Sequence, residues 1–183
     1  EWIAHGPEVE EEIALANIAL DLIGQTRMLY VRAAAADPGV LDGLPTGSVA
    51  AEDALAYFRG PEGFRNVCLT ELPRGDFAFT VVRLFALSSW RLARFSELRE
   101  HRDPVLSAIA DRGIKELDYH RDHAARWLVT LARGTEESRR RTEAALEAVW
   151  PWTSELEGMP EEDWSIEPPT EEPSPYRATS PST

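Results

Sequence analysis

Residues 103–133, DPVLSAIADRGIKELDYHRDHAARWLVTLAR, decide the fold. The segment opens with Asp103, a residue type that caps helix N-termini, followed by Pro104, which fits a first helical turn. Apolar or small residues then recur every three or four positions, at Leu106, Ile109, Gly113, Leu117, Ala124, Trp127 and Leu131. Because an α-helix has about 3.6 residues per turn, these side chains share one face. The segment is therefore expected to form one long helix that buries this face against other helices.

Three further long helices are expected, over residues 8–36, 77–102 and 136–156. The first two lie in proline-free stretches, and Asp76 and Thr135 stand at the capping positions of the second and third. Shorter helical segments are expected at 52–59 and 62–72. No run alternates polar and apolar residues in the manner of a strand, so the prediction is an all-α, up-down helical bundle.

The character of the sequence changes after Leu156. Residues 157–183 are rich in Pro, Ser, Thr and Glu, and such a segment buries too little apolar surface to offset the entropy lost on ordering. Two interpretations stay open: a disordered tail, or an extended arm that docks on a neighbour through Trp164 and Tyr176. The expected organisation is a bundle over residues 1–156 and a tail over 157–183. The sequence begins at Glu1 rather than Met, so the N-terminal helix is expected to be truncated.

Composition limits the classes of function. The chain has 183 residues and a net charge of −13, which argues against nucleic acid and anionic membranes as partners. No apolar run approaches the roughly 18 residues of a membrane span. The one cysteine, Cys68, forms no intrachain disulfide, so a cytoplasmic protein is expected, with Cys68 as a small core residue. Arginine outnumbers lysine, which is present only as Lys115, and this favours contacts with other proteins.

Polar residues interrupt the apolar helix expected at 8–36. Asn17, Asp21 and Gln25 follow one another at intervals of four, so they lie on one side of the helix. Two interpretations stay open. The row is either the solvent face of the helix, or an inward-facing remnant of a site in the bundle core.

His120 falls within the apolar face of the helix expected at 104–133, next to Leu117, so it is expected to point into the bundle. Glu116, Tyr119 and His123 lie beside it. A single histidine on an apolar face is more often a hydrogen-bonded core residue than a metal ligand. A di-metal carboxylate site in a bundle uses a Glu-x-x-His motif on each of two helices, and the sequence contains no such motif.

Several strings taken together resemble the non-catalytic, PaaC-type subunit of the bacterial phenylacetyl-CoA monooxygenase (1,2-epoxidase) complex. They are EW (1–2) and HGPE (5–8), ALANIALDLIGQTRMLY (14–30), FRNVCLTELPRGDFA (64–78), IKELDYHRDHAARWLVTLARGTEES (114–138) and ALEAVWPWTSEL (145–156). The resemblance covers about residues 1–156. It implies a ferritin-like bundle with short extra helices between the second and third long helices. The truncated N-terminal helix counts as the first, so the second and third are those expected at 8–36 and 77–102. It also implies a role in phenylacetate catabolism beside a homologous di-iron catalytic subunit.

The resemblance further implies which positions would carry the ligands in the di-iron relative. Of six ligand positions, only Glu1 and His120 keep ligand chemistry here. The vestigial positions are Glu1, Leu22, Gln25, Ser88, Glu116, Leu117 and His120, with Glu116 one position out of register. A degenerate di-iron site is thus expected, with no metal, cofactor or catalytic residue in this chain and the di-iron centre in the partner subunit.

Three functions stay in consideration. The first is a structural subunit, a homo- or hetero-dimer building block of a larger oxygenase complex and not catalytic by itself. The second is a ferritin-like metal oxidase with an atypical ligand set, drawn from Glu1, Asp21, Glu116, His120 and His123. The third is a stand-alone ligand-binding helical bundle. Trp150 and Trp152 are expected at the surface, where they favour the first.

Overall fold

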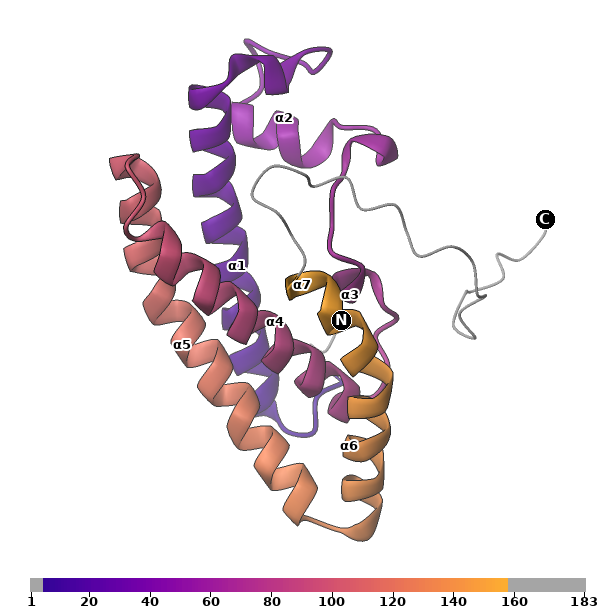
Figure 1. The fold of residues 1–183 in the computed structure, drawn as a ribbon. Coiled ribbons are helices and arrows are strands. Elements are labelled where there is room, and N and C mark those ends of the chain that lie inside the picture. The colour runs from indigo at the N-terminus through magenta and orange to yellow at the C-terminus, as the bar shows by residue number, and fades with distance from the viewer. Residues whose placement is uncertain (1–4, 158–183) are drawn as a thin grey trace, which may run out of the picture.

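A computed structural model describes residues 5–157, and within that range the regular structure is entirely helical (Figure 1). The long helices are α1 (Val9–Ala36), α4 (Phe77–Leu98), α5 (Pro104–Arg133) and α6 (Glu136–Val149). Helices α4 and α5 pack along most of their length, α6 packs against both, and α1 packs against α5. The predicted all-α, up-down bundle is confirmed. Glu1 and the predicted tail, with Trp164 and Tyr176, lie outside the described residues.

Capping side chains begin the later helices where the sequence predicted. Asp76, Asp103 and Thr135 each accept a hydrogen bond from a backbone N–H in the turn that follows. These bonds satisfy N–H groups that have no partner inside the helix. Helix α5 therefore has the predicted bounds, from Pro104 to Arg133.

Two predicted helix ends were wrong. Helix α4 ends at Leu98 rather than Arg102, because the backbone tightens there into bonds of the i to i−3 type, such as Glu100 N–H to Glu97 O. Helix α6 ends at Val149, before Pro151, which has no N–H to continue the ladder. A 3-10 helix, η3 (Trp150–Thr153), and a single turn, α7 (Ser154–Glu157), follow in place of the predicted continuous helix.

The connection between α1 and α4 contains four short elements, η1 (Pro38–Leu41), α2 (Ala51–Tyr57), η2 (Pro61–Gly63) and α3 (Cys68–Glu71). The helix predicted at 62–72 was therefore wrong. Arg59 organises this stretch in a different way. Its guanidinium donates to the carbonyl of Gly63 and lies over the ring of Phe64, 4.5 Å from its centroid. That contact holds the residues between η2 and α3 in an extended path.

Glu155 fixes the start of α3. Its carboxylate accepts hydrogen bonds from the backbone N–H groups of Cys68, over 2.9 Å, and Leu69, over 2.7 Å. Cys68 is half-buried rather than a core residue, so that prediction was wrong. Partial burial and then the Glu155 carboxylate raise the pKa of the Cys68 thiol, which keeps it protonated and unreactive.

The apolar core is concentrated at one end of the bundle. Its largest cluster joins α3, α4, α6 and α7 through Leu69, Ala78, Val82, Ala145, Val149 and Leu156. Trp152 is half-buried against this cluster, contrary to prediction, whereas Trp150 is exposed as predicted.

A second apolar cluster, Phe95, Ala110 and Leu117, lies between α4 and α5. Gly113 allows the close approach there, because an added Cβ would lie 2.5 Å from Cε1 of Phe95. Among the described residues, no helix combines the length and the hydropathy needed to cross a bilayer.

Candidate functional site

Helices α1 and α5 are joined by polar side chains at four levels. The two helices run antiparallel, so residue numbers rise along one as they fall along the other. The contacts pair Glu11 with His123, Asp21 with His120, Gln25 with Glu116, and Arg32 with Asp103. Because buried polar groups are costly unless they are paired, these contacts specify how α1 sits on α5.

Glu11 is the most buried carboxylate of this interface, with 3% of its surface exposed. One of its oxygens lies 3.0 Å from Nε2 of His123, and the other accepts a 2.5 Å hydrogen bond from the indole N–H of Trp127. The sequence prediction missed Glu11, which was one of several acidic residues in a first helical turn. A signal existed, because Glu11, Ile18 and Gln25 recur at intervals of seven and all three are buried.

His120 is 1% exposed, and its Nε2 lies 3.0 Å from Oδ2 of Asp21. The prediction of an inward, hydrogen-bonded core histidine is confirmed. Its Nδ1 has no hydrogen-bond partner within the part of the chain that the structure describes. Tyr119, by contrast, is half exposed and lies edge-on to the His120 ring, with 6.1 Å between ring centroids.

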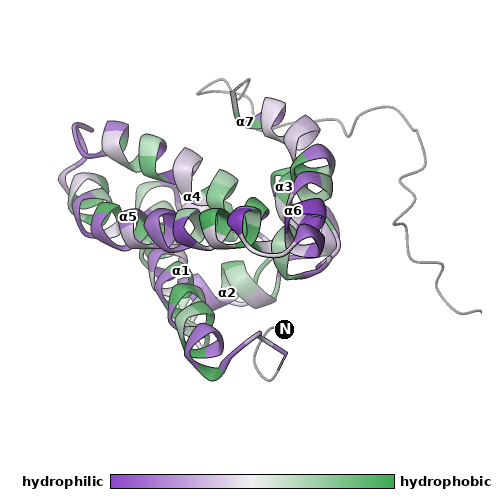
Figure 2. Cartoon of the chain, turned by 90° about the horizontal axis from the view of Figure 1, so that it is seen from below, coloured by the Kyte–Doolittle hydropathy of each residue, from purple (hydrophilic) through white to green (hydrophobic). Residues whose placement is uncertain are grey.

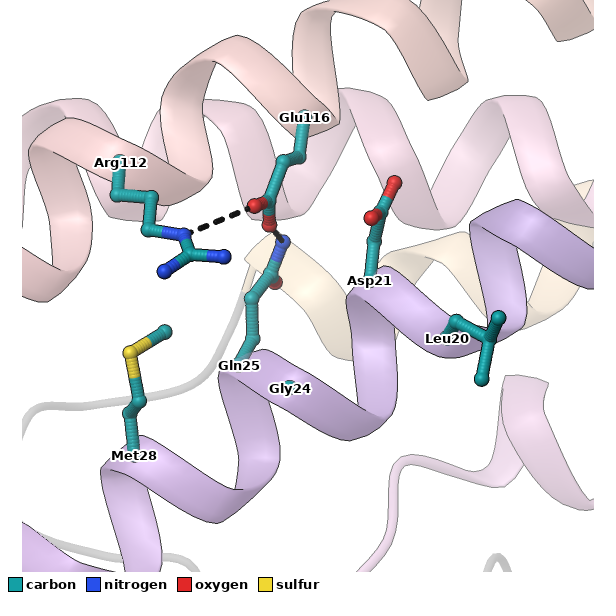
Figure 3. A pocket seen from close by; sticks show the side chains of 7 residues that line it. All are labelled: Leu20, Asp21, Gly24, Gln25, Met28, Arg112 and Glu116. Carbon is teal, nitrogen blue, oxygen red and sulfur yellow. Dashed lines mark hydrogen bonds and ion pairs between the residues drawn. The ribbon is translucent and has the colours of Figure 1, made fainter.

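Gln25 is the centre of the network and has no exposed surface. Its amide nitrogen donates to Glu116 on α5, and its amide oxygen accepts from Nη2 of Arg91 on α4, each over 2.8 Å. Glu116 in turn accepts a 3.2 Å hydrogen bond from Nε of Arg112 (Figure 3). Burial lowers the pKa of the Arg91 guanidinium, which also lies over the ring of Phe95. Arg91 was not among the predicted site residues.

The polar row on α1 follows neither of the two open interpretations along its whole length. Asn17 is exposed, Asp21 is half-buried and Gln25 is fully buried. Each step of four residues rotates by about 40° around a helix of about 3.6 residues per turn, so the row winds from solvent into the core.

Two other positions that the family resemblance implied, Leu117 and Ser88, hold side chains that already have partners within the bundle. Leu117 has no exposed surface and belongs to the apolar cluster between α4 and α5. Ser88 is buried, and its hydroxyl donates to the carbonyl of Leu84 one turn earlier. Leu22 is half-buried, and Glu1 lies outside the described residues.

Those of these residues that the structure describes do not fit a di-iron centre. Iron of that kind needs convergent carboxylates and imidazoles, whereas the core here presents the Arg91 cation, the Gln25 amide and the aliphatic Leu117 side chain. The ligand set considered for an atypical oxidase is also divided. Asp21 contacts His120, Glu116 pairs with Gln25, and His123 pairs with Glu11. The fifth member, Glu1, lies outside the described residues. Within residues 5–157, no three His, Cys, Asp or Glu side chains are grouped as metal ligands would be.

A small pocket opens beside this network, between α1 and α5, with a volume of about 110 Å³. Figure 3 shows the side chains that line it, Leu20, Asp21, Gly24, Gln25, Met28, Arg112 and Glu116. One wall is therefore apolar and the other is formed by the polar contacts just described.

Fold and site together define the class of protein: an all-helical bundle whose core contains polar side chains that are hydrogen-bonded to one another. Residues 1–177 match the family of the phenylacetic acid catabolic protein, and the chain belongs to that family. It is 40% identical over 156 residues to the PaaC subunit of the 1,2-phenylacetyl-CoA epoxidase of Escherichia coli (strain K12). The match covers 85% of this chain and 59% of the relative, so the chain spans about three fifths of that relative's length. The resemblance predicted from the sequence is confirmed.

Proposed function

We propose that the chain is the non-catalytic, PaaC-type subunit of a multicomponent phenylacetyl-CoA epoxidase in phenylacetate catabolism. It assembles with a homologous di-iron catalytic subunit and supports it. Membership of the phenylacetic acid catabolic protein family and the 40% identity to the PaaC subunit of an epoxidase support this function. The partner carries the metal chemistry, and this chain carries a stable surface for the partner.

The observation that carries the proposal is the position of Gln25 between Arg91 and Glu116. The family resemblance implies a ligand histidine where Gln25 stands. A cation in a protein interior repels a metal ion strongly, because the local dielectric is low. The Arg91 guanidinium, held against Gln25, thus opposes metal binding at the centre of the bundle and favours a structural role.

The remaining polar pairs support the same role. The carboxylate of Glu11 contacts the imidazole of His123, and that of Asp21 contacts the imidazole of His120. These side chains therefore bind each other rather than a substrate. Buried polar pairs of this kind fix the register of packed helices in some proteins. Here they keep α1 rigid, so that a partner meets a preformed surface.

The test is co-expression of this chain with a homologous di-iron catalytic subunit, followed by iron analysis of the complex and of each separated subunit. A stable complex with iron on the catalytic subunit supports the proposal. Stoichiometric iron on this chain would favour the oxidase alternative. A chain that stays monomeric beside the catalytic subunit would favour the stand-alone bundle.

A further inference from the structure

Helices α1 and α2 project from the layer that α4, α5 and α6 form, as Figure 2 shows. The main neighbours of α2 are α1 and η1, and an ion pair between Arg27 and Glu52 also joins α2 to α1. We call α1, η1 and α2 the arm, residues 9–57, and we call α3 to α7 the body, residues 68–157. The described part of the chain is thus divided into two sets of helices, each packed mainly within itself.

The arm meets the body mainly where α1 packs on α5, and that contact is largely polar. The buried residues of α1 are Glu11, Ile18, Gln25 and Ala34. Glu11 contacts two side chains of α5, and Gln25 contacts one side chain of α5 and one of α4. We call these contacts of Glu11 and Gln25 the latch.

The two apolar clusters of the described residues lie in the body, with buried members from α3 to α7. Helix α1 reaches them through Leu29, at the margin of the cluster around Phe95. When the arm opens, the latch groups regain hydrogen bonds from water, whereas unfolding of the body exposes both apolar clusters. Opening of the arm should therefore cost less free energy than unfolding of the body.

The chain changes from arm to body over three residues. The guanidinium of Arg59 donates to the hydroxyl of Tyr30 on α1 over 2.7 Å and lies over the Phe64 ring, so the chain up to there is held by the arm. Glu155 holds the start of α3 on the body. Residues 65–67 lie between these two anchors, and the first two of them are exposed. A small rotation of the backbone there can move the arm without disturbing either anchor.

We propose that the arm is a hinged element that opens from the body as one unit while the body stays folded. Residues 65–67 are the hinge, and the latch sets the fraction of molecules in which the arm is open. The position of a large part of the subunit thus depends on two buried side chains, Glu11 and Gln25. This inference does not depend on the proposed function, because it concerns the chain alone.

Native-state hydrogen exchange of the whole chain is the test, because it measures the free energy of opening at each amide. Val149→Ala, in an apolar cluster of the body, should speed exchange of body amides about tenfold and leave arm amides unchanged. Ala145→Gly, buried in the same cluster, serves if Val149→Ala does not fold. Gln25→Leu should speed both arm and body amides by on the order of a hundredfold, because the body unfolds only after the latch breaks. Asn17→Leu, at an exposed position of α1, is the control and should change neither set.

The unequal response to a body variant is the result that supports a separate arm. If Val149→Ala or Ala145→Gly speeds arm and body amides by the same factor, the two sets of helices unfold as one unit and the proposal is wrong. It is also wrong if Gln25→Leu leaves the arm amides unchanged, since the latch would then not hold the arm. Either outcome leaves the proposed function intact, because assembly with a catalytic subunit is measured separately.

Discussion

The Arg91 guanidinium on α4 donates a 2.8 Å hydrogen bond to the amide oxygen of Gln25 on α1. The amide nitrogen of Gln25 donates over the same distance to Glu116 on α5. One fully buried side chain thus joins three long helices. The donor on one side and the acceptor on the other fix the orientation of the amide, so neither a carboxylate nor an aliphatic side chain replaces it without loss.

Gln25→Leu should lower the free energy of unfolding by about 3 kcal/mol, because the largely buried Arg91 guanidinium and the Glu116 carboxylate each lose the hydrogen bond to Gln25, and Glu116 keeps only Arg112. Asn17→Leu is the matched control, since Asn17 belongs to the same polar row but is exposed. Urea denaturation of both variants provides the comparison. Equal stability of the two variants would show that the Gln25 network contributes nothing to the fold.

The two helical glycines should respond to alanine with opposite signs. Gly113→Ala should destabilise the chain by about 1–3 kcal/mol, because the new methyl overlaps the buried ring of Phe95. Gly24→Ala should leave stability unchanged or raise it by about 1 kcal/mol through helix propensity. Thermal and urea denaturation measure both. A destabilising Gly24→Ala would mean that the space beside Gly24 is filled by residues outside the range 5–157.

The sequence predicted well what depends on neighbouring residues. The caps at Asp76, Asp103 and Thr135 and the inward face that carries His120 are local, because a side chain and the next turn determine them. The contacts made by Glu11 and Arg91 were missed. Each depends on the register between two helices far apart in the chain, which packing sets and periodicity does not reveal.

The row of Asn17, Asp21 and Gln25 illustrates the same limit in another way. Its spacing was visible, but its burial depends on how far α1 turns before it meets α5. The prediction of a helix at 62–72 was wrong for a related reason. The contacts of Arg59 with Gly63 and Phe64, and those of Glu155 with the start of α3, decide its path.

His120→Leu should leave turnover of the assembled epoxidase largely intact and change the free energy of unfolding by no more than about 1 kcal/mol. The reason is that His120 contacts Asp21, which is half-buried and becomes hydrated when the imidazole is removed. Steady-state turnover of the reconstituted complex, with assembly checked by native mass spectrometry, tests this. Loss of turnover in a fully assembled complex would give His120 a chemical role, in contradiction to the structural one proposed.

Acid should weaken α6 through Glu137. Hydrogen bonds from Arg140 and then Arg141 lower the pKa of Glu137 to about 2, from an ordinary value of 4.5. A carboxyl with a depressed folded pKa stabilises the fold above its unfolded pKa, and this contribution is lost as pH falls from about 4.5 toward 2.

Glu137→Gln should therefore reduce stability at neutral pH, and its difference from wild type should shrink through that acid window. The effect is small and sensitive to salt, because the cluster is exposed. Glu143→Gln on the same helix is the control, and melting temperature against pH is the measurement. A difference that stays constant from pH 7 to pH 2 would contradict the assignment.

The central claim is that this chain supports an oxygenase without holding its metal. The most direct measurement is the iron content of this chain and of its catalytic partner, each loaded with Fe(II) under anaerobic conditions, separated and exposed to oxygen. We predict iron and an oxo-bridge absorption band in the catalytic partner, and neither above background in this chain. Stoichiometric iron in this chain, with that absorption band, would contradict the claim.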